Sequence, residues 1–246
     1  MIWQGKEPGA WAEAWAVPVV EIYESIGSTN DRALDLAASV GGALAVVIAD
    51  EQTAGRGRRG ARWHSPPGGG LWMSLVLPSP RPSPHASLLV GLAVAEAIEA
   101  LAPEIRVGIK WPNDLMVRGG KLGGILCEST GAAIVAGIGI NVRALGTTPA
   151  TSLAYRATSL EVECGKSFAT SDLAGCIVER LKGRSWGLDA EVSEALAGRD
   201  ALLGAAVETE EHGAGVARGI DRSGALILER PDGSRVRVVA GSVRAL

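Results

Sequence analysis

Residues 44–62 read LAVVIADEQTAGRGRRGAR, and the two halves of this stretch decide the fold. The first half, 44–49, is a continuous apolar run, which is typical of a strand buried on both faces. The second half, 53–62, holds three glycines and four arginines, so no regular element can run through it and we expect a loop. Guanidinium groups on such a loop are suited to hold carboxylate and phosphate oxygens.

The segments around this loop alternate between strand and helix patterns. Strands are expected at 19–23, 71–77, 105–110 and 132–140, with a hairpin of 115–117 and 121–128 around Arg118-Gly119-Gly120. Helices are expected at 28–39, 84–101 with Ser83-Pro84 as its cap, 171–182 and 189–197. We therefore predict an α+β fold, a mixed β-sheet with packed helices, over residues 1–198.

After Gly198 the pattern changes to short strands separated by turn residues. The expected strands are 204–210, 215–220, 225–229 and 235–240. This spacing is typical of a small all-β barrel of about 45 residues. We therefore predict a second domain over residues 199–246.

Composition narrows the function classes. The chain has 246 residues, with 24 Lys+Arg against 27 Asp+Glu and a net charge of −3, which argues against a protein that coats polyanions. Three cysteines are an odd number without metal-ligand spacing, which indicates a reducing compartment, and we expect a cytoplasmic protein. Residues 1–18 do not resemble a signal peptide, and the most apolar stretch, 87–102, is too short to span a membrane.

The arginine–glycine loop has several interpretations on its residues alone. Residues 55–60 match G-x-G-x-x-G, but the sequence that follows cannot open a helix, so dinucleotide binding is not expected. Ala61 stands where a P-loop would need its lysine. Three interpretations stay open: a loop that closes on an anion, a solvated basic turn, and an RNA-binding segment.

Two further segments carry polar side chains at strand ends. KWPND at 110–114 and KLGGI at 121–125 place two lysines and a carboxylate around one hairpin, where Gly123-Gly124 allows close approach. GIGIN at 137–141 ends a strand with an amide that can both donate and accept. Turn formation and ordinary surface pairing are the alternative explanations for these polar residues.

Taken together, these segments resemble the biotin protein ligases, the biotin–[acetyl-CoA-carboxylase] ligases. The resemblance rests on five blocks in the same order: Ser28-Thr29-Asn30, 50–60 with Trp63, 110–114, 121–126 and 137–141. Residues 218–226 also resemble the SH3-like end domain of that family. The resemblance implies a class II synthetase-like catalytic domain followed by an SH3-like β-barrel.

The resemblance also implies a two-step reaction that uses ATP, biotin and Mg²⁺. The carboxylate of biotin would attack the α-phosphate of ATP to give biotinyl-5′-AMP, and a lysine of a biotin carboxyl carrier protein would then displace AMP. Several cations would be needed to hold two mutually repelling anions together. Metal ligands are not identified by the sequence.

Site residues follow from the same resemblance. It assigns biotin binding to Ser28, Thr29, Asn30, Gln52, Gly55, Arg56, Arg58, Trp63, Lys121, Gly123 and Gly124. It assigns ATP binding to Arg56, Arg58, Arg59, Trp63, Lys110, Asn113, Lys121 and Asn141, with an adenine-side loop near 147–155. Catalysis is expected of Lys121, Arg56 and Asp114, and Asp114 would orient or deprotonate the incoming lysine amine.

The sequence departs from the family in two places. Ala61 replaces a further basic residue that many relatives carry, so the loop has one cation fewer. Some relatives begin with a helix-turn-helix domain, whereas only about 18 residues precede the first expected strand here. We therefore expect a monofunctional enzyme that does not bind DNA, with a homodimer as one form of assembly.

Two alternatives to a biotin ligase are kept. The related lipoate or octanoyl ligases and transferases share the fold, and one branch uses a cysteine nucleophile, for which Cys127 is available, although a buried strand cysteine needs no chemistry. The second alternative is an RNA-binding module. RNA recognition usually adds aromatic side chains on which bases stack, and the chain has only one Phe and two Tyr, which argues against it.

Overall fold

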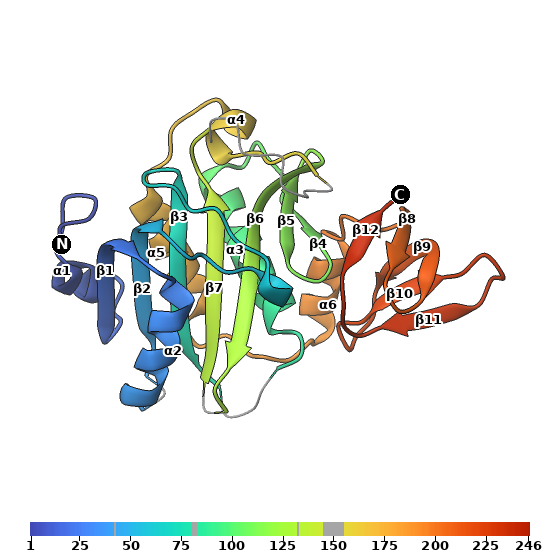
Figure 1. Ribbon diagram of the computed structural model, residues 1–246, viewed down its shortest axis with the longest axis horizontal. Helices are drawn as coiled ribbons and strands as arrows, with labels where there is room; N and C mark the ends of the chain where they lie inside the picture. The colour runs from blue at the N-terminus through green and yellow to red at the C-terminus, as the bar shows by residue number, and fades with distance from the viewer. Residues whose placement is uncertain (42, 80–82, 132, 145–154) are drawn as a thin grey trace.

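A seven-stranded mixed sheet forms the centre of the larger part of the molecule (Figure 1). The computed structural model describes residues 1–41, 43–79, 83–131, 133–144 and 155–246. The strand order is β1-β2-β3-β7-β6-β5-β4, in which β1 and β2 are parallel and the other neighbours are antiparallel. The strands are β1 (Val19–Ile26), β2 (Ala45–Gln52), β3 (Gly70–Pro78), β4 (Gly108–Lys110), β5 (Asp114–Val117), β6 (Gly120–Ser129) and β7 (Ala133–Asn141). The mixed sheet predicted from the sequence is confirmed.

Helices cover both faces of this sheet (Figure 1). On one face α2 packs on β2, β3 and β7, and on the other face α3 and α5 pack on the sheet and on each other. The helices are α1 (Pro8–Ala14), α2 (Thr29–Ser39), α3 (Ala86–Leu101), α4 (Leu160–Cys164), α5 (Thr170–Leu181) and α6 (Ala190–Ala197). Because β2 lies between two helical layers, Val46 and Ile48 face one apolar cluster and Ala45 and Val47 face the other, as the continuous apolar run predicts.

The cap predicted for α3 is wrong. The helix begins at Ala86 after His85, not at Pro84. The Ser83 hydroxyl donates instead to the backbone carbonyl of Trp186 at 3.2 Å. A tertiary contact has therefore replaced the local cap.

The strand expected at 105–110 is shorter than predicted, because only Gly108–Lys110 pair with β5. The other side of β4 is covered by the chain that follows α6: the Ile109 amide donates to the Arg199 carbonyl at 2.6 Å, and the Ala201 amide donates to the Ile109 carbonyl at 3.0 Å. The β5–β6 hairpin is confirmed, with Arg118 and Gly119 both at positive φ (47° and 76°), as a tight two-residue turn requires.

A five-stranded antiparallel sheet of order β11-β10-β9-β8-β12 forms the C-terminal part. Its strands are β8 (Ala206–Thr209), β9 (Gly213–Ile220), β10 (Leu226–Glu229), β11 (Arg235–Val238) and β12 (Val243–Ala245). The predicted all-β unit is confirmed, but the fifth strand, β12, was not predicted. A domain boundary at 198/199 stays a prediction.

Two short helices were also missed, α1 and α4, because elements this short show no periodicity. Three tryptophans, Trp3, Trp11 and Trp15, form an aromatic cluster around α1, with the rings of Trp11 and Trp15 stacked at 5.0 Å. Among the described residues no helix is both long and apolar enough to cross a bilayer.

Candidate functional site

A cavity of about 520 Å³ lies where the arginine–glycine loop, the start of α2, the β5–β6 hairpin and β7 meet. Predicted site residues that line it are Ser28, Thr29, Asn30, Gln52, Arg56, Arg58, Arg59, Trp63, Lys110, Asn113, Asp114, Lys121 and Gly124. Ser242 and Val243 reach it from the C-terminal sheet. Residues from seven separate segments of the chain therefore share one space.

Three of the predicted site residues do not line this cavity. Gly55 lies inside the loop, where its carbonyl accepts from the Trp63 amide at 2.9 Å. Gly123 faces β7, and a Cβ there would lie 2.5 Å from the carbonyl oxygen of Gly139. Asn141 is buried and donates to the Thr158 carbonyl at 3.0 Å, so its amide is used within the fold. The adenine-side loop expected near 147–155 falls mostly outside the described residues.

The arginine–glycine loop is hydrogen-bonded to itself. The Gly57 amide donates to the Ala61 carbonyl at 2.7 Å, and the Gln52 amide donates to the Ser65 carbonyl at 3.1 Å. Arg59 has a φ of 58°, a left-handed conformation that turns the chain at the tip. One interpretation of the sequence was a loop that closes on an anion, and in the structure the loop backbone is already hydrogen-bonded to itself.

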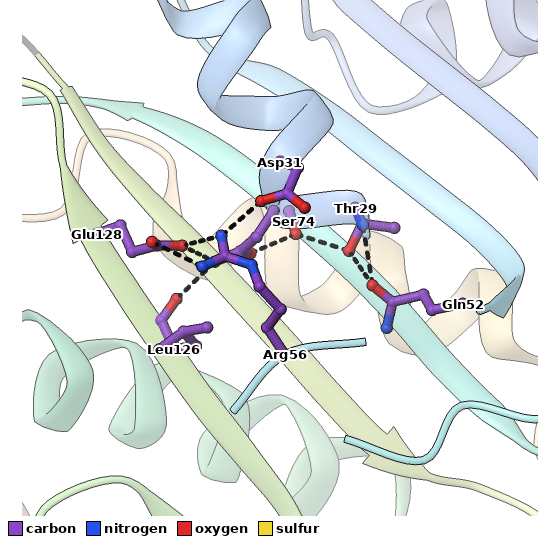
Figure 2. A network of polar contacts seen from close by, with 8 residues as sticks. Thr29, Asp31, Gln52, Arg56, Ser74, Leu126 and Glu128 are labelled. Atoms are coloured by element: carbon purple, nitrogen blue, oxygen red, sulfur yellow. Dashed lines mark hydrogen bonds and ion pairs between the residues drawn. The ribbon is translucent and has the colours of Figure 1, made fainter. Parts of the chain in front are cut away.

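One end of the cavity is a network of amide and hydroxyl side chains next to Arg56, whose charge is paired with Asp31 and Glu128 (Figure 2). The Gln52 Oε1 atom accepts from both the amide and the hydroxyl of Thr29, at 2.9 and 3.0 Å. The Ser74 hydroxyl lies 2.6 Å from Oδ1 of Asn30, whose Nδ2 donates to Glu128 at 2.8 Å. These amides and hydroxyls present donors and acceptors side by side, which suits a neutral ligand that carries both.

The other end is strongly cationic. Apart from Arg56, the cations among the described lining residues are Arg58, Arg59, Arg62, Lys110 and Lys121, and Asp114 is the single carboxylate among them. Lys110 Nζ and Lys121 Nζ contact different oxygens of Asp114, at 3.1 and 2.6 Å. An enclosed surface with this excess of positive charge attracts anions.

Arg58 differs from Arg56 and Arg59 because no carboxylate pairs with it in the described part of the chain. Its guanidinium donates to the Gly241 carbonyl at 3.1 Å and to Asn113 Oδ1 at 3.4 Å. Burial lowers the pKa of Arg58, and the attraction of Asp114 only partly opposes this. An anion entering the cavity would remove this penalty, so Arg58 is the side chain best placed to bind one.

A floor of glycines lies under the indole of Trp63. Gly124 and Gly139 are paired across β6 and β7, and a Cβ at Gly139 would lie 2.5 Å from Trp63 Nε1. Gly137 contacts Asn30, where a Cβ would lie 2.2 Å from Oδ1. The sequence placed Gly137 and Gly139 in a motif without assigning them to the site. Their spacing of two on one strand was the signal that both occupy the same face.

Cys127 does not belong to this cavity. This half-buried residue has its thiol near Ser87 of α3, on the opposite face of the sheet. Burial raises the pKa of Cys127 to about 12, against a smaller lowering by a hydrogen bond to Ser87. Since the thiolate is the nucleophile, this environment does not favour the cysteine-transferase alternative.

The residues do not form a magnesium site. In the described ranges no group of three or more His, Cys, Asp or Glu side chains could hold a metal ion. Both oxygens of Asp114 are already engaged by lysines. None of the described residues is therefore assigned as a metal ligand.

Comparison with known proteins identifies the family. A model of the biotin/lipoate A/B protein ligase family matches residues 23–144, and a model of the biotin protein ligase C-terminal domain matches residues 207–244. The biotin–[acetyl-CoA-carboxylase] ligase of Paracoccus denitrificans is 37% identical over 233 residues, which cover 85% of this chain and 93% of that protein. The chain therefore belongs to the biotin protein ligase family, and the predicted resemblance is confirmed.

Two further proteins are similar to this chain, one in sequence and one in structure. The bifunctional ligase/repressor BirA of Bacillus spizizenii is 41% identical over 165 residues, 63% of this chain and 50% of that protein, so the chain spans about half the length of this relative. A solved biotin protein ligase from Aquifex aeolicus, in complex with biotin and ATP, has a TM-score of 0.78 at 27% identity and covers 93% of this chain and 100% of its own. The fold class predicted from the sequence is thereby confirmed.

Gly139→Ala tests the glycine floor. The added methyl group would overlap the indole of Trp63, so we expect a loss of about 1–3 kcal/mol in the free energy of unfolding. Gly91→Ala in α3 is the matched control, because its Cβ would meet its nearest atom at 3.8 Å and should be neutral or stabilise by up to about 1 kcal/mol. Urea denaturation measures both, and equal midpoints for the two variants would contradict the overlap.

Proposed function

We propose that the chain is a biotin protein ligase, which activates biotin with ATP to biotinyl-5′-AMP and transfers the biotinyl group to a lysine of a biotin carboxyl carrier protein. The observation that carries the proposal is the single cavity that joins a neutral polar end to a cationic end. Biotin has two ends that complement those of the cavity: an uncharged ureido ring and a negatively charged carboxylate.

The ureido ring would bind at the polar end. A urea carbonyl needs donors and its two N–H groups need acceptors, and the side chains of Ser28, Thr29, Asn30 and Gln52 offer both. The glycine floor at Gly124 and Trp63 above it would enclose the apolar part of biotin. The valeryl chain would then point toward the lysines.

The reaction would take place at the cationic end. An oxygen of the biotin carboxylate attacks the α-phosphorus of ATP and pyrophosphate leaves. Next, the lysine nitrogen of the carrier attacks the carbonyl carbon, AMP leaves, and the amine loses a proton. Lys121, Lys110 and Arg58 would offset the negative charges that the first step brings together. Asp114, the carboxylate among the described lining residues, would orient or deprotonate the amine.

We extend the proposal to the metal ion, the partner protein and the cell compartment. Mg²⁺ would enter bound to the phosphates of ATP, with Lys110, Asn113 and Arg59 near the nucleotide. A carrier domain of acetyl-CoA carboxylase is the proposed partner, supported by the name of the Paracoccus relative. A cytoplasmic location is proposed because all three cysteines are free. Neither DNA binding nor a homodimer is part of the proposal.

Mass spectrometry of a purified carrier domain, incubated with the chain, ATP, Mg²⁺ and biotin, tests this function. We expect one biotinyl group on one lysine, and no modification when ATP is left out. Lipoate and octanoate in parallel reactions distinguish the related enzymes of the same fold. Modification by lipoate or octanoate in place of biotin would contradict the proposal.

Lys121→Ala tests the charge argument. The ammonium group lies 2.6 Å from Asp114 and 5.4 Å from the centre of the Trp63 ring, where it would face the charge that develops during adenylation. We expect pyrophosphate release to slow about 10²-fold or more in a single-turnover experiment. Lys166→Ala, at a surface lysine paired with Glu104, is the control and should react like the unmodified chain. A burst of normal rate in Lys121→Ala would reject this role.

Arg58→Ala tests containment of the adenylate. Arg58 ties the loop to both Asn113 and the Gly241 carbonyl, so we expect the variant to release biotinyl-AMP and to label bystander proteins several-fold more strongly on a streptavidin blot. Arg62→Ala removes the same charge from the same loop, but Arg62 donates only within the loop, to the Thr53 carbonyl at 3.0 Å. Equal bystander labelling by the two variants would contradict a specific role for Arg58.

A further inference from the structure

Arg56 is the most completely paired of the loop arginines. Its guanidinium makes two hydrogen bonds to Glu128, at 3.1 and 2.7 Å, and contacts Asp31 at 2.7 Å. Burial disfavours its charge, but the two carboxylates outweigh this and raise the pKa of Arg56. Figure 2 shows the guanidinium between Asp31 on α2 and Glu128 on β6. The charge of Arg56 is therefore already balanced by the protein.

This pairing distinguishes Arg56 from Arg58. An arginine that binds a substrate anion needs donors that are free to turn toward it, and Arg58 has only neutral acceptors. Drawing Arg56 onto a ligand carboxylate would break its two-point contact with the half-buried Glu128 and its contact with the exposed Asp31. The contacts thus oppose the role of anion ligand that family resemblance gave to Arg56.

The position of Arg56 in the loop indicates what the pairs do instead. The loop backbone folds on itself between Gln52 and Ser65, and Arg56 ties it sideways to α2 and β6. Glu128 also accepts from Asn30 Nδ2, which places the anchor next to the polar end of the cavity. A carboxylate that grips a guanidinium at two points fixes orientation as well as distance.

We propose that Glu128 and Asp31 are positioning residues. By pairing with Arg56 they keep loop 53–65 closed over the cavity, and we call this set of contacts between Arg56, Glu128 and Asp31 the latch. Arg56 then acts through the position of the loop, and anion contact belongs to Arg58 and the two lysines. The consequence for the reaction rests on the proposed function, whereas the latch itself is a property of the free chain.

Hydrogen exchange of the free chain, followed by mass spectrometry, tests the latch without any ligand. In Glu128→Ala we expect peptides covering 54–63 to exchange about fivefold faster or more. Arg56→Ala also removes the contact with Asp31, so its loop should exchange at least as fast, and the double variant should exchange no faster than Arg56→Ala. Glu128→Gln keeps the shape and should show the same direction. Glu21→Gln is the matched control: it breaks a bidentate pair with Arg32 at 2.7 Å that does not touch the loop.

Enzyme assays of the same variants test the consequence. We expect biotinyl-AMP to leave the enzyme faster in all three, in the same order as their loop exchange, with the pyrophosphate burst reduced in both Arg56→Ala and Glu128→Ala. Two results would overturn the latch: loop exchange that stays normal in both Glu128 variants, or a burst lost in Arg56→Ala but kept in Glu128→Ala. If the proposed function were wrong, the outcome would be different: the unmodified chain would show no pyrophosphate burst, but loop 53–65 would still exchange faster in the variants.

Discussion

The excess of positive charge around one carboxylate is the constraint on which the site depends. Lys110 and Lys121 both contact Asp114, and Arg58 lies near it without a carboxylate of its own among the described residues. Such a cluster is costly to bury, because the like charges repel and lose hydration. An anionic ligand would relieve that cost, which is what the proposed reaction of two anions would require of the site.

The sheet makes this cluster possible. The tight β5–β6 hairpin puts Asp114 and Lys121 on adjacent strands, and Lys110 ends β4 on the outer side of β5. Gly124 on β6 and Gly139 on β7 have no side chains, so the indole of Trp63 can contact both strands closely. The helix layer behind the sheet then fixes these strands, since α3 is buried along most of its length and packs on both the sheet and α5.

The loop arginines have different tasks despite their similar sequence surroundings. Arg56 is paired with carboxylates of α2 and β6, Arg59 is paired with Glu210 of the C-terminal part, and Arg58 contacts only neutral acceptors. Through these contacts the loop joins three parts of the molecule. The position of the loop over the cavity therefore depends on both the central sheet and the C-terminal sheet.

Local sequence determined most of the elements and most of the site. The apolar run at 44–49, the turn residues Arg118-Gly119 and the arginine–glycine loop each fix local structure through burial or backbone geometry, and the motif order identified the family. Short elements such as α1 and β12 escaped prediction because their stability comes from partners distant in the chain. Only the tertiary structure decided that Asn141 is used inside the fold, that Gly123 faces β7, and that Arg56 is paired. Partners of a side chain depend on which strands become neighbours, and the one-dimensional pattern does not contain that information.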